Sequence, residues 1–164
     1  MKILVLSDSH SSLVFMRKAI RSVKPDAVVH LGDHYDDAVA MSEEFSHIVF
    51  HMVPGNCDFC SVFDPHPEVL CYDVCGVRLF MTHGHMQSVK SSLHRLIHDA
   101  FEKNAAAALY GHTHVADCHW EGDMLVLNPG SCGSGRRTAG LIETNEGKIV
   151  ISRILDEFDL EEFK

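Results

Sequence analysis

Six short apolar runs in this sequence each end in a cluster of residues that can bind a metal ion or form a tight turn. The runs ILVL, VVHL, VFHMV, RLFM, AALY and LVL lead into segments 7–10, 32–34, 54–58, 82–85, 111–114 and 128–131. In open α/β sheets, ligands bind in the crevice at the carboxyl ends of the strands. If these runs are strands of such sheets, we expect the clusters to converge on one site.

The side chains of these clusters combine imidazole, carboxylate and amide groups. This mixture suits borderline divalent ions such as Mn, Fe, Co or Zn, whereas an all-oxygen set indicates Mg or Ca. One tetrahedral zinc ion cannot use them all, because it takes about four ligands. We therefore expect two ions that share a carboxylate and clamp the attacking and leaving oxygens of an in-line displacement at phosphorus. The candidate metal ligands are Asp8, His10, Asp33, Asn56, His83, His112 and His114.

The elements that hold these clusters follow from the alternation of apolar runs with amphipathic stretches, which predicts an α/β half and then a β-rich half. Consecutive apolar residues over 3–6 are typical of a parallel strand buried on both faces. Further strands are expected at 27–31, 48–53, 68–72, 77–81, 106–110, 118–121, 124–127, 139–143 and 148–154.

Helical spacing and end signals predict the helices. The first begins at an N-cap, Ser12, and stops at Pro25. The second opens at Asp36 or Asp37 and ends near Phe45. The third covers 91–104 with Leu93, Ile97 and Phe101 on one side, and 156–164 forms a short helix or a frayed tail.

Composition limits the possible partners. The 164 residues carry a formal net charge of −9 and 13 histidines, with 46% hydrophobic residues, which suits a single domain over 1–164. Binding to a polyanion rests on Lys and Arg, so we do not expect a long nucleic acid as partner. No apolar run reaches the roughly 18 residues of a membrane span, and no leader segment is recognisable. We therefore expect a cytoplasmic protein without membrane contact, whose cysteines are reduced.

The motif series D-x-H, G-D, G-N-x-D, H-G-H and G-H-x-H, in that order, resembles the calcineurin-like metallophosphoesterase superfamily. The short chain, the G-N-C-D form and the closing N-P-G-S resemble its small YfcE-type phosphodiesterase branch. The resemblance implies an α/β fold, a four-layer α/β/β/α sandwich of two mixed sheets flanked by helices. It also implies two divalent metal ions, with Mn as the first expectation and Ni, Co, Fe and Zn as alternatives.

Carried over by motif position, the resemblance divides the ligands between two ions. Asp33 would bridge them. Asp8, His10 and His114 would hold one ion, and Asn56, His83 and His112 the other. A hydroxide between the ions would then attack phosphorus in line with the leaving group.

The function that the resemblance implies is hydrolysis of a small phosphodiester. A phosphomonoesterase or a nuclease of the same superfamily is an alternative, because the motifs do not choose between these substrates. A protein-binding scaffold similar to the retromer subunit of this fold, with a vestigial metal site, is an alternative of another class. The filled ligand positions favour an enzyme.

One position departs from the superfamily pattern. Cys57 stands where many members have a histidine that protonates the leaving group, and a thiol with an ordinary pKa of about 8.5 is a poor substitute. His85 and His34 are therefore further candidates for the proton donor or for substrate contact.

Other residues are candidates for supporting roles. Arg136 and Arg137, in a Gly/Ser-rich loop, could contact the substrate phosphate. Asp58 and Asn128 could accept a hydrogen bond from a neighbouring histidine and orient it. Glycines beside the ligands, at 55, 84 and 111, should allow tight turns. The apolar residues of the 59–67 loop, Phe59, Val62 and Phe63, could form a homo-oligomer contact or pack on their own domain.

Overall fold

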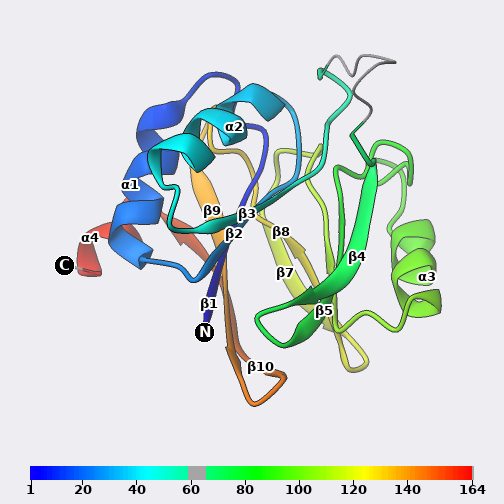
Figure 1. The fold of residues 1–164 in the computed structure, drawn as a ribbon. Helices are drawn as coiled ribbons and strands as arrows, with labels where there is room; N and C mark the ends of the chain where they lie inside the picture. The colour runs from blue at the N-terminus through cyan, green and yellow to red at the C-terminus, as the bar shows by residue number, and fades with distance from the viewer. Residues whose placement is uncertain (59–65, 164) are drawn as a thin grey trace.

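Two five-stranded sheets face each other in the structure, a computed structural model that describes residues 1–58 and 66–163 (Figure 1). The first sheet has the strand order β10–β9–β1–β2–β3, and the second has the order β4–β5–β6–β8–β7. The strands of the first sheet are β1 (Lys2–Leu6), β2 (Ala27–His30), β3 (Val49–Met52), β9 (Thr138–Asn145) and β10 (Lys148–Asp156). Those of the second are β4 (Val69–Val74), β5 (Val77–Thr82), β6 (Ala107–Leu109), β7 (Asp117–Glu121) and β8 (Met124–Asn128).

Both sheets are mixed. Strands β1, β2 and β3 are parallel, and β9 joins them antiparallel to β1. In the second sheet, β5, β6 and β8 are parallel, while β4 and β7 form antiparallel edges. The parallel strands of each sheet bring their carboxyl ends to one rim, where the loops of the metal-ligand motifs begin.

Helices cover the outer face of each sheet (Figure 1). Helices α1 (Leu13–Val23), α2 (Tyr35–Glu44) and α4 (Asp159–Glu162) lie against the first sheet, and α3 (His94–Glu102) lies against the second. The predicted four-layer α/β/β/α sandwich is thereby confirmed.

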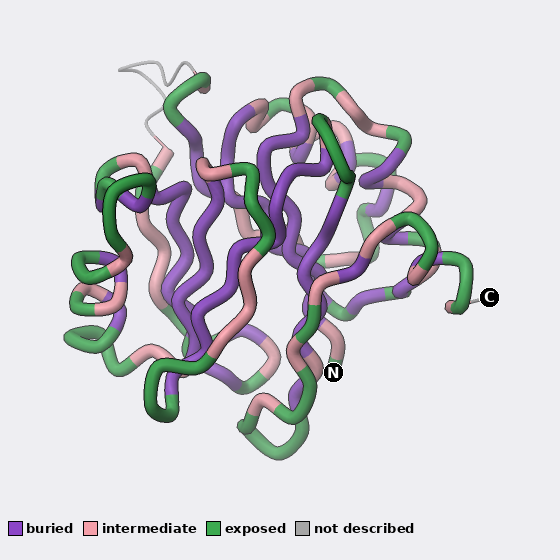
Figure 2. The backbone as a smooth tube through the Cα atoms, turned by 180° about the vertical axis from the view of Figure 1, so that it is seen from behind, coloured by how far each residue is buried: buried purple, intermediate pink, exposed green. Residues whose placement is uncertain are grey.

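The strand pattern explains the layers. In β1, Ile3 and Val5 point into the core between the sheets, whereas Leu4 and Leu6 face the helices. Since side chains alternate along a strand, one fully apolar run supplies two cores. A third core lies between the second sheet and α3, around Phe80. Figure 2 shows the result: the buried backbone is concentrated in the strands, and exposed segments lie on α3 and in the turns.

Helix α1 forms much as its sequence predicts. Its apolar side chains, including Met16, Ile20 and Val23, are buried at steps of three or four residues. Ser12 occupies the N-cap position, but its side chain makes no capping hydrogen bond. The helix ends where Lys24 adopts a left-handed backbone (φ 50°), immediately before Pro25, because a residue before proline disfavours helical geometry.

Helix α3 differs from its prediction. It begins at His94, and its fully buried residues are Leu96 and Ala100, while Phe101 is 72% exposed. Each step of four residues turns about 40° beyond a full helical turn. The stripe that starts near the sheet at Leu93 therefore ends in solvent at Phe101.

The β4–β5 hairpin is tighter than the predicted turn over 73–76. The two strands pair up to Val74 and Val77, so the turn is Cys75–Gly76. Both turn residues have positive φ, 50° and 81°, as the two-residue turns that match the twist of a hairpin require.

Among the residues that the structure describes, no helix is long and apolar enough to cross a membrane. Within the same residues the cysteines at 57, 71, 75, 118 and 132 are free thiols. The apolar residues proposed for a homo-oligomer contact, Phe59, Val62 and Phe63, lie outside the described residues.

Candidate metal centre

The motif loops of the two sheets are hydrogen-bonded to one another at the rim. The backbone N–H of Asp8 donates to Gly32 O (2.9 Å), and that of Gly111 donates to His83 O (3.0 Å). The ring of His83, from the second sheet, bonds to Leu31 O of the first sheet at 2.7 Å. These bonds hold loops that are far apart in sequence in a single site.

A first group of ligand atoms comes from Asp8, His10, Asp33 and His114. One ligand atom of each lies within 4.8 Å of the others. His114 Nε2 is 3.0 Å from Asp8 Oδ1 and 3.4 Å from His10 Nε2. This close approach of nitrogen and oxygen ligands is the geometry that a borderline divalent ion needs.

The Asp8 carboxylate is fully buried and unequally satisfied. Its Oδ2 accepts from the Ser7 hydroxyl (2.6 Å) and from the His112 N–H (3.2 Å). Its Oδ1, which faces His114, has no hydrogen-bond partner within the described part of the chain. A buried carboxylate oxygen without a donor is costly, and a bound cation at this point would satisfy it. The residues present therefore fit a metal ion.

A second group of ligand atoms adjoins the first through Asp33. His83 Nε2 lies 3.1 Å from Asn56 Oδ1 and 3.4 Å from Asp33 Oδ1. Because a carbonyl can only accept, His83 Nδ1 carries the proton that is donated to Leu31 O, and Nε2 presents its lone pair to the group. The Asn56 amide nitrogen points instead to Cys57 Sγ (3.5 Å).

Asp33 is held in its charged form at the junction of the two groups. Burial alone raises the pKa of this carboxyl, but the hydrogen bond from the Cys57 N–H and then the electrostatic influence of the neighbouring His83 ring outweigh burial and lower the pKa below its usual value. The Cys57 N–H donates to Asp33 Oδ1 at 2.9 Å. An ionised carboxylate within reach of both groups is the residue type that two cations can share.

His112 lies beside the second group. Its ring centroid is 5.0 Å from that of His83. Burial, together with the nearby His83 and Lys90, lowers the pKa of His112 to about 4. Its imidazole is therefore neutral at pH 7 and has a lone pair available for a metal.

The backbone is left-handed at five of the seven candidate ligands. Positive φ angles occur at Asp8 (52°), His10 (43°), Asp33 (56°), His112 (67°) and His114 (61°). Such angles are uncommon for residues other than glycine, cost roughly 1–3 kcal/mol each, and cluster at functional sites. The surrounding fold must therefore hold these five residues in a conformation that is costly in isolation.

Two of the three motif glycines act by lacking a side chain, not by adopting a special φ. A Cβ at Gly55 would overlap Asp33 Oδ1, and one at Gly111 would overlap Ser7 Oγ and lie 2.9 Å from Asp8 Oδ2. Gly84 alone of the three has positive φ (102°), as expected for a tight turn. The glycines at 55 and 111 let the backbone approach the carboxylates closely.

Asp58 and Asn128 hold loops, in place of the predicted contacts with a histidine. Asp58 accepts from the backbone N–H groups of Gly55 (2.7 Å) and Tyr35 (2.8 Å). The Asn128 amide donates to Gly111 O (2.9 Å) and Thr113 Oγ1 (3.0 Å). Both residues therefore act on the ligands through the backbone that carries them.

The candidate proton donors border the ligand groups. The His85 ring lies 5.4 Å from that of His83, and its Nε2 is 3.7 Å from Glu68 Oε2. The His34 ring lies 5.1 Å from that of His10. Cys57 is exposed as a whole residue. The limited burial of its sulfur, and then the nearby Asp33, raise the pKa of its thiol. Their role in proton transfer stays a prediction.

Arg136 and Arg137 pair with carboxylates at the end of β10. Arg136 forms an ion pair with Asp156, and Arg137 Nη1 lies 3.3 Å from Glu157 Oε1. The Arg136 side chain is 80% exposed. Contact with a substrate phosphate stays a prediction and would require these pairs to open.

Some residues at the site were not found from the sequence. Ser7 donates to Asp8 Oδ2, and Ser131 donates to Asp8 O at 2.8 Å. Both serines belong to the motifs S-D-S-H and N-P-G-S, so the sequence could have indicated them as supporting residues. The role of the Leu31 carbonyl could not be predicted from the sequence, because every residue has a carbonyl.

Comparison with known proteins agrees with this geometry. Residues 1–147 match the model of the calcineurin-like phosphoesterase superfamily domain. The chain is 28% identical to the phosphodiesterase MJ0936 of Methanocaldococcus jannaschii, over 89% of this chain and 95% of that protein.

Solved structures give the same fold. A predicted phosphoesterase of Streptococcus pneumoniae has a TM-score of 0.74 at 27% identity, covering 95% of this chain and 97% of that one. Vps29 of Entamoeba histolytica, solved in complex with Zn²⁺, has a TM-score of 0.72 at 18% identity, covering 95% and 99%. At 18% identity the likeness concerns the fold alone.

Proposed function

This chain belongs to the calcineurin-like phosphoesterase superfamily, and we propose that it uses two divalent metal ions to hydrolyse small phosphodiesters. The observation that carries the proposal is the pair of ligand groups joined at Asp33. In the first group, Asp8 Oδ1 is buried without a hydrogen-bond partner among the described residues and lies 3.0 Å from His114 Nε2. In the second, the lone pair of His83 Nε2 faces Asn56 Oδ1. A cation in each group would satisfy these atoms.

The ions, when bound, would supply positive charge for the phosphoryl oxygens and would acidify a water molecule. The chain's own residues supply the placement. Asp8, His10 and His114 would hold one ion, Asn56, His83 and His112 the other, and Asp33 both. The left-handed backbone at five of these ligands and the hydrogen bonds behind them keep the donor atoms in place before substrate arrives, which reduces reorganisation during the reaction.

The charge of the chain supports reliance on metal ions. The net charge is −9, and both candidate phosphate contacts, Arg136 and Arg137, are paired to carboxylates, so neither has a free positive charge to offer a phosphodiester. Mn is the first candidate metal, with Ni, Co, Fe and Zn as alternatives, because both groups mix nitrogen and oxygen ligands. Free thiols at the described cysteines support a reducing compartment, the cytoplasm.

A diester substrate is supported by the phosphodiesterase activity in the name of the archaeal relative. A monoester or a short nucleic acid remains an alternative substrate for the same centre. A second candidate function, a protein-binding scaffold, is supported by the fold likeness to Vps29. The two classes differ in what the metal-loaded protein does to a phosphate ester.

The test begins with the metal content of the purified protein. After chelation, Mn, Ni, Co, Zn and Mg are added back separately, and hydrolysis of bis-p-nitrophenyl phosphate is compared with that of p-nitrophenyl phosphate. We expect Mn to restore diesterase activity. Two bound ions with hydrolysis of neither ester would refute the enzyme and favour the scaffold.

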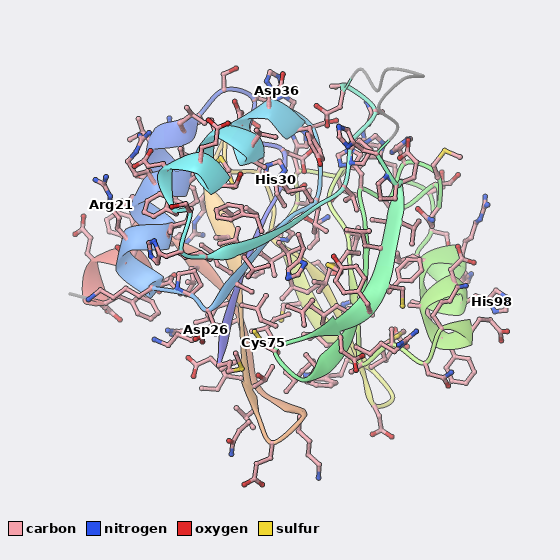
Figure 3. All side chains as sticks on the ribbon, in the orientation of Figure 1. Arg21, Asp26, His30, Asp36, Cys75 and His98 are labelled. Atoms are coloured by element: carbon pink, nitrogen blue, oxygen red, sulfur yellow. The ribbon has the colours of Figure 1, made fainter. Side chains whose placement is uncertain are left out.

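Asp33→Asn is the sharper variant. Loss of the shared charge is expected to remove at least one bound ion and to lower activity by more than about a hundredfold, as is common when a charge that stabilises the transition state is removed. Asp36→Asn is the matched control, because Asp36 is exposed at the start of α2 (labelled in Figure 3). Wild-type metal content and activity in Asp33→Asn would show that Asp33 does not bridge two ions.

A further inference from the structure

A cavity of about 560 Å³ lies on the outer face of the second sheet, lined by residues of β4, β5 and α3. Helix α3 packs mainly on β6, whereas β4 is the edge strand beyond β5. The outward side chains of β4, Val69 and Cys71, are therefore only partly covered. Together with the buried Phe80 they form an apolar floor for the cavity.

One buried polar group, the side-chain amide of Gln87, also lines this cavity and is only partly hydrogen-bonded. Gln87 is 5% exposed, and among the described residues its amide bonds to Thr82 Oγ1 alone, at 3.2 Å. A primary amide has two N–H donors. Whichever way the amide is turned, at least one N–H therefore lacks an acceptor. Because a buried donor without an acceptor is costly, a ligand that brings a carbonyl oxygen is favoured.

The rim of the cavity carries charges of both signs. Arg78 is already engaged, since its Nε donates to Lys103 O (2.8 Å) and its Nη1 lies 3.7 Å from Asp73 Oδ1. The other charged groups on the rim are the Lys103 ammonium and the carboxylates of Asp99 and Glu102. Two cationic and two anionic side chains leave the lining without net charge. An uncharged ligand complements this rim better than an anion or a cation does.

We propose that this cavity binds a small uncharged molecule that has an apolar body and a carbonyl group. The body would lie on Val69, Cys71 and Phe80, and the carbonyl oxygen would accept the unpaired N–H of Gln87. Ligand pockets typically have volumes of about 300–1,000 Å³ and combine an apolar lining with a few placed polar groups. Among the described residues that line the cavity, none is a candidate metal ligand, so the site is separate from the metal centre.

The turn that follows His83 holds Gln87 in place. The Gln87 and Val89 N–H groups both donate to Gly84 O, at 3.1 and 3.3 Å. The Gly84 N–H in turn donates to Thr82 Oγ1 (3.3 Å), the atom that bonds to the Gln87 amide. An amide that is fixed before the ligand arrives lowers the entropic cost of binding.

The test uses the fact that Gln87 is the only glutamine of the chain. Cell-free synthesis with glutamine that carries nitrogen-15 in its side-chain amide gives one NH₂ signal pair, which reports this site. The whole chain is loaded with Zn²⁺, whose filled d shell does not broaden the signals, and is titrated with benzamide. We expect a saturable shift of the Gln87 signals with a dissociation constant of about 1–10 mM, ordinary for a ligand of this size. Nuclear Overhauser contacts should join the benzamide ring to the Gln87 amide.

Two matched probes test the chemical class of the ligand. Toluene keeps the apolar ring but has no carbonyl group, and benzoate replaces the uncharged amide with a carboxylate. Each should bind at least about fivefold more weakly than benzamide, because toluene makes no hydrogen bond to Gln87 and benzoate brings a charge to a lining without net charge.

A pair of variants at one position tests the location. Cys71→Trp fills part of the cavity with a residue that strands favour and should weaken benzamide binding by more than about tenfold through steric exclusion. Cys71→Ser keeps the size of the side chain and should bind within about threefold of wild type. Melting temperatures without probe show whether the variants fold. If Cys71→Trp does not, Cys71→Leu takes its place and should weaken binding by about threefold.

Three outcomes would overturn the proposal. Without a saturable shift in benzamide, the cavity holds water alone. If toluene or benzoate binds as tightly as benzamide, Gln87 does not select an uncharged carbonyl group. If the folded, cavity-filling variant binds benzamide like wild type, the ligand lies elsewhere. None of these measurements involves catalysis, and we expect the same shifts in chelated protein, so a failure to hydrolyse phosphate esters would leave the result standing.

Discussion

His30, the last residue of β2, is expected to make the protein acid-sensitive. Its side chain is fully buried (labelled in Figure 3), and burial lowers the pKa of this histidine to about 4. The Gly32 N–H donates to His30 Nδ1 at 3.3 Å, so the hydrogen of the ring is on Nε2, which has no acceptor among the described residues. The folded protein therefore holds a neutral imidazole and gives a second proton no partner.

The sign and size of the effect follow from the two pKa values. An unfolded chain binds the proton at about pH 6.5, and the folded chain binds it only near pH 4. The stabilisation is therefore complete above pH 6.5 and is lost as the pH falls toward 4. A gap of this size corresponds to about 3 kcal/mol, since each pKa unit contributes about 1.4 kcal/mol.

The assay is urea unfolding of metal-free protein at pH 7.5 and at pH 4.5, for wild type and for His30→Gln. Glutamine keeps an acceptor for the Gly32 N–H but does not titrate. Metal-ligand histidines titrate in both proteins, so their effect cancels in the comparison. Between the two pH values, wild type should lose about 2–3 kcal/mol more of its free energy of unfolding than the variant loses.

The comparison can fail in a clear way. If both proteins lose stability by the same amount over this interval, burial of His30 does not set its pKa. If the variant loses more than wild type, the sign of the linkage is wrong.

Two further predictions concern packing. Gly111→Ala would place a Cβ against Ser7 Oγ and Asp8 Oδ2. We expect the free energy of unfolding, measured with urea, to fall by about 1–3 kcal/mol and Mn²⁺ binding to weaken. A variant that keeps wild-type values for both would contradict the close approach at this glycine. Leu96→Ala removes a fully buried side chain of α3 and should cost about 2–5 kcal/mol, whereas Phe101→Ala, at a residue 72% exposed, should change stability by less than about 0.5 kcal/mol. Equal losses of stability in Leu96→Ala and Phe101→Ala would show that Phe101 lies on the buried face of α3.

Much of the fold could be predicted because its signals are local. Runs that are apolar at every position, such as 3–6, report strands buried on both faces, and the two cores on either side of β1 confirm this reading. Helix faces were harder. In the sequence, Leu93 and Phe101 belong to one apolar stripe of α3, yet the second sheet covers only part of that stripe. Which part is covered depends on how α3 sits on strands that come from other segments of the chain.

The candidate metal centre, like the fold, could be predicted only in part. The residue types at the strand ends indicated metal ions and phosphate ester chemistry, because few other functions need imidazole, carboxylate and amide groups after so many strands. The supporting contacts were not predictable. Asp58 and Asn128 bond to backbone groups, and both loop arginines pair with carboxylates near the chain's end, contacts for which neighbouring sequence contains no signal.

By itself, the sequence determined the order of the motifs, the chemical types of the ligands and the succession of an α/β half and a β-rich half, since these depend on side-chain type and spacing along the chain. The four layers were implied by the resemblance to the superfamily. Tertiary structure alone decided which atoms face each other. His112 N–H meets Asp8 across 104 residues, and Ser131 meets the same residue across 123. Such contacts depend on strand register and on left-handed backbone at the ligands, which the packing of the whole molecule imposes. The tautomer of the buried His83, whose Nδ1 donates to Leu31 O, follows from one such contact.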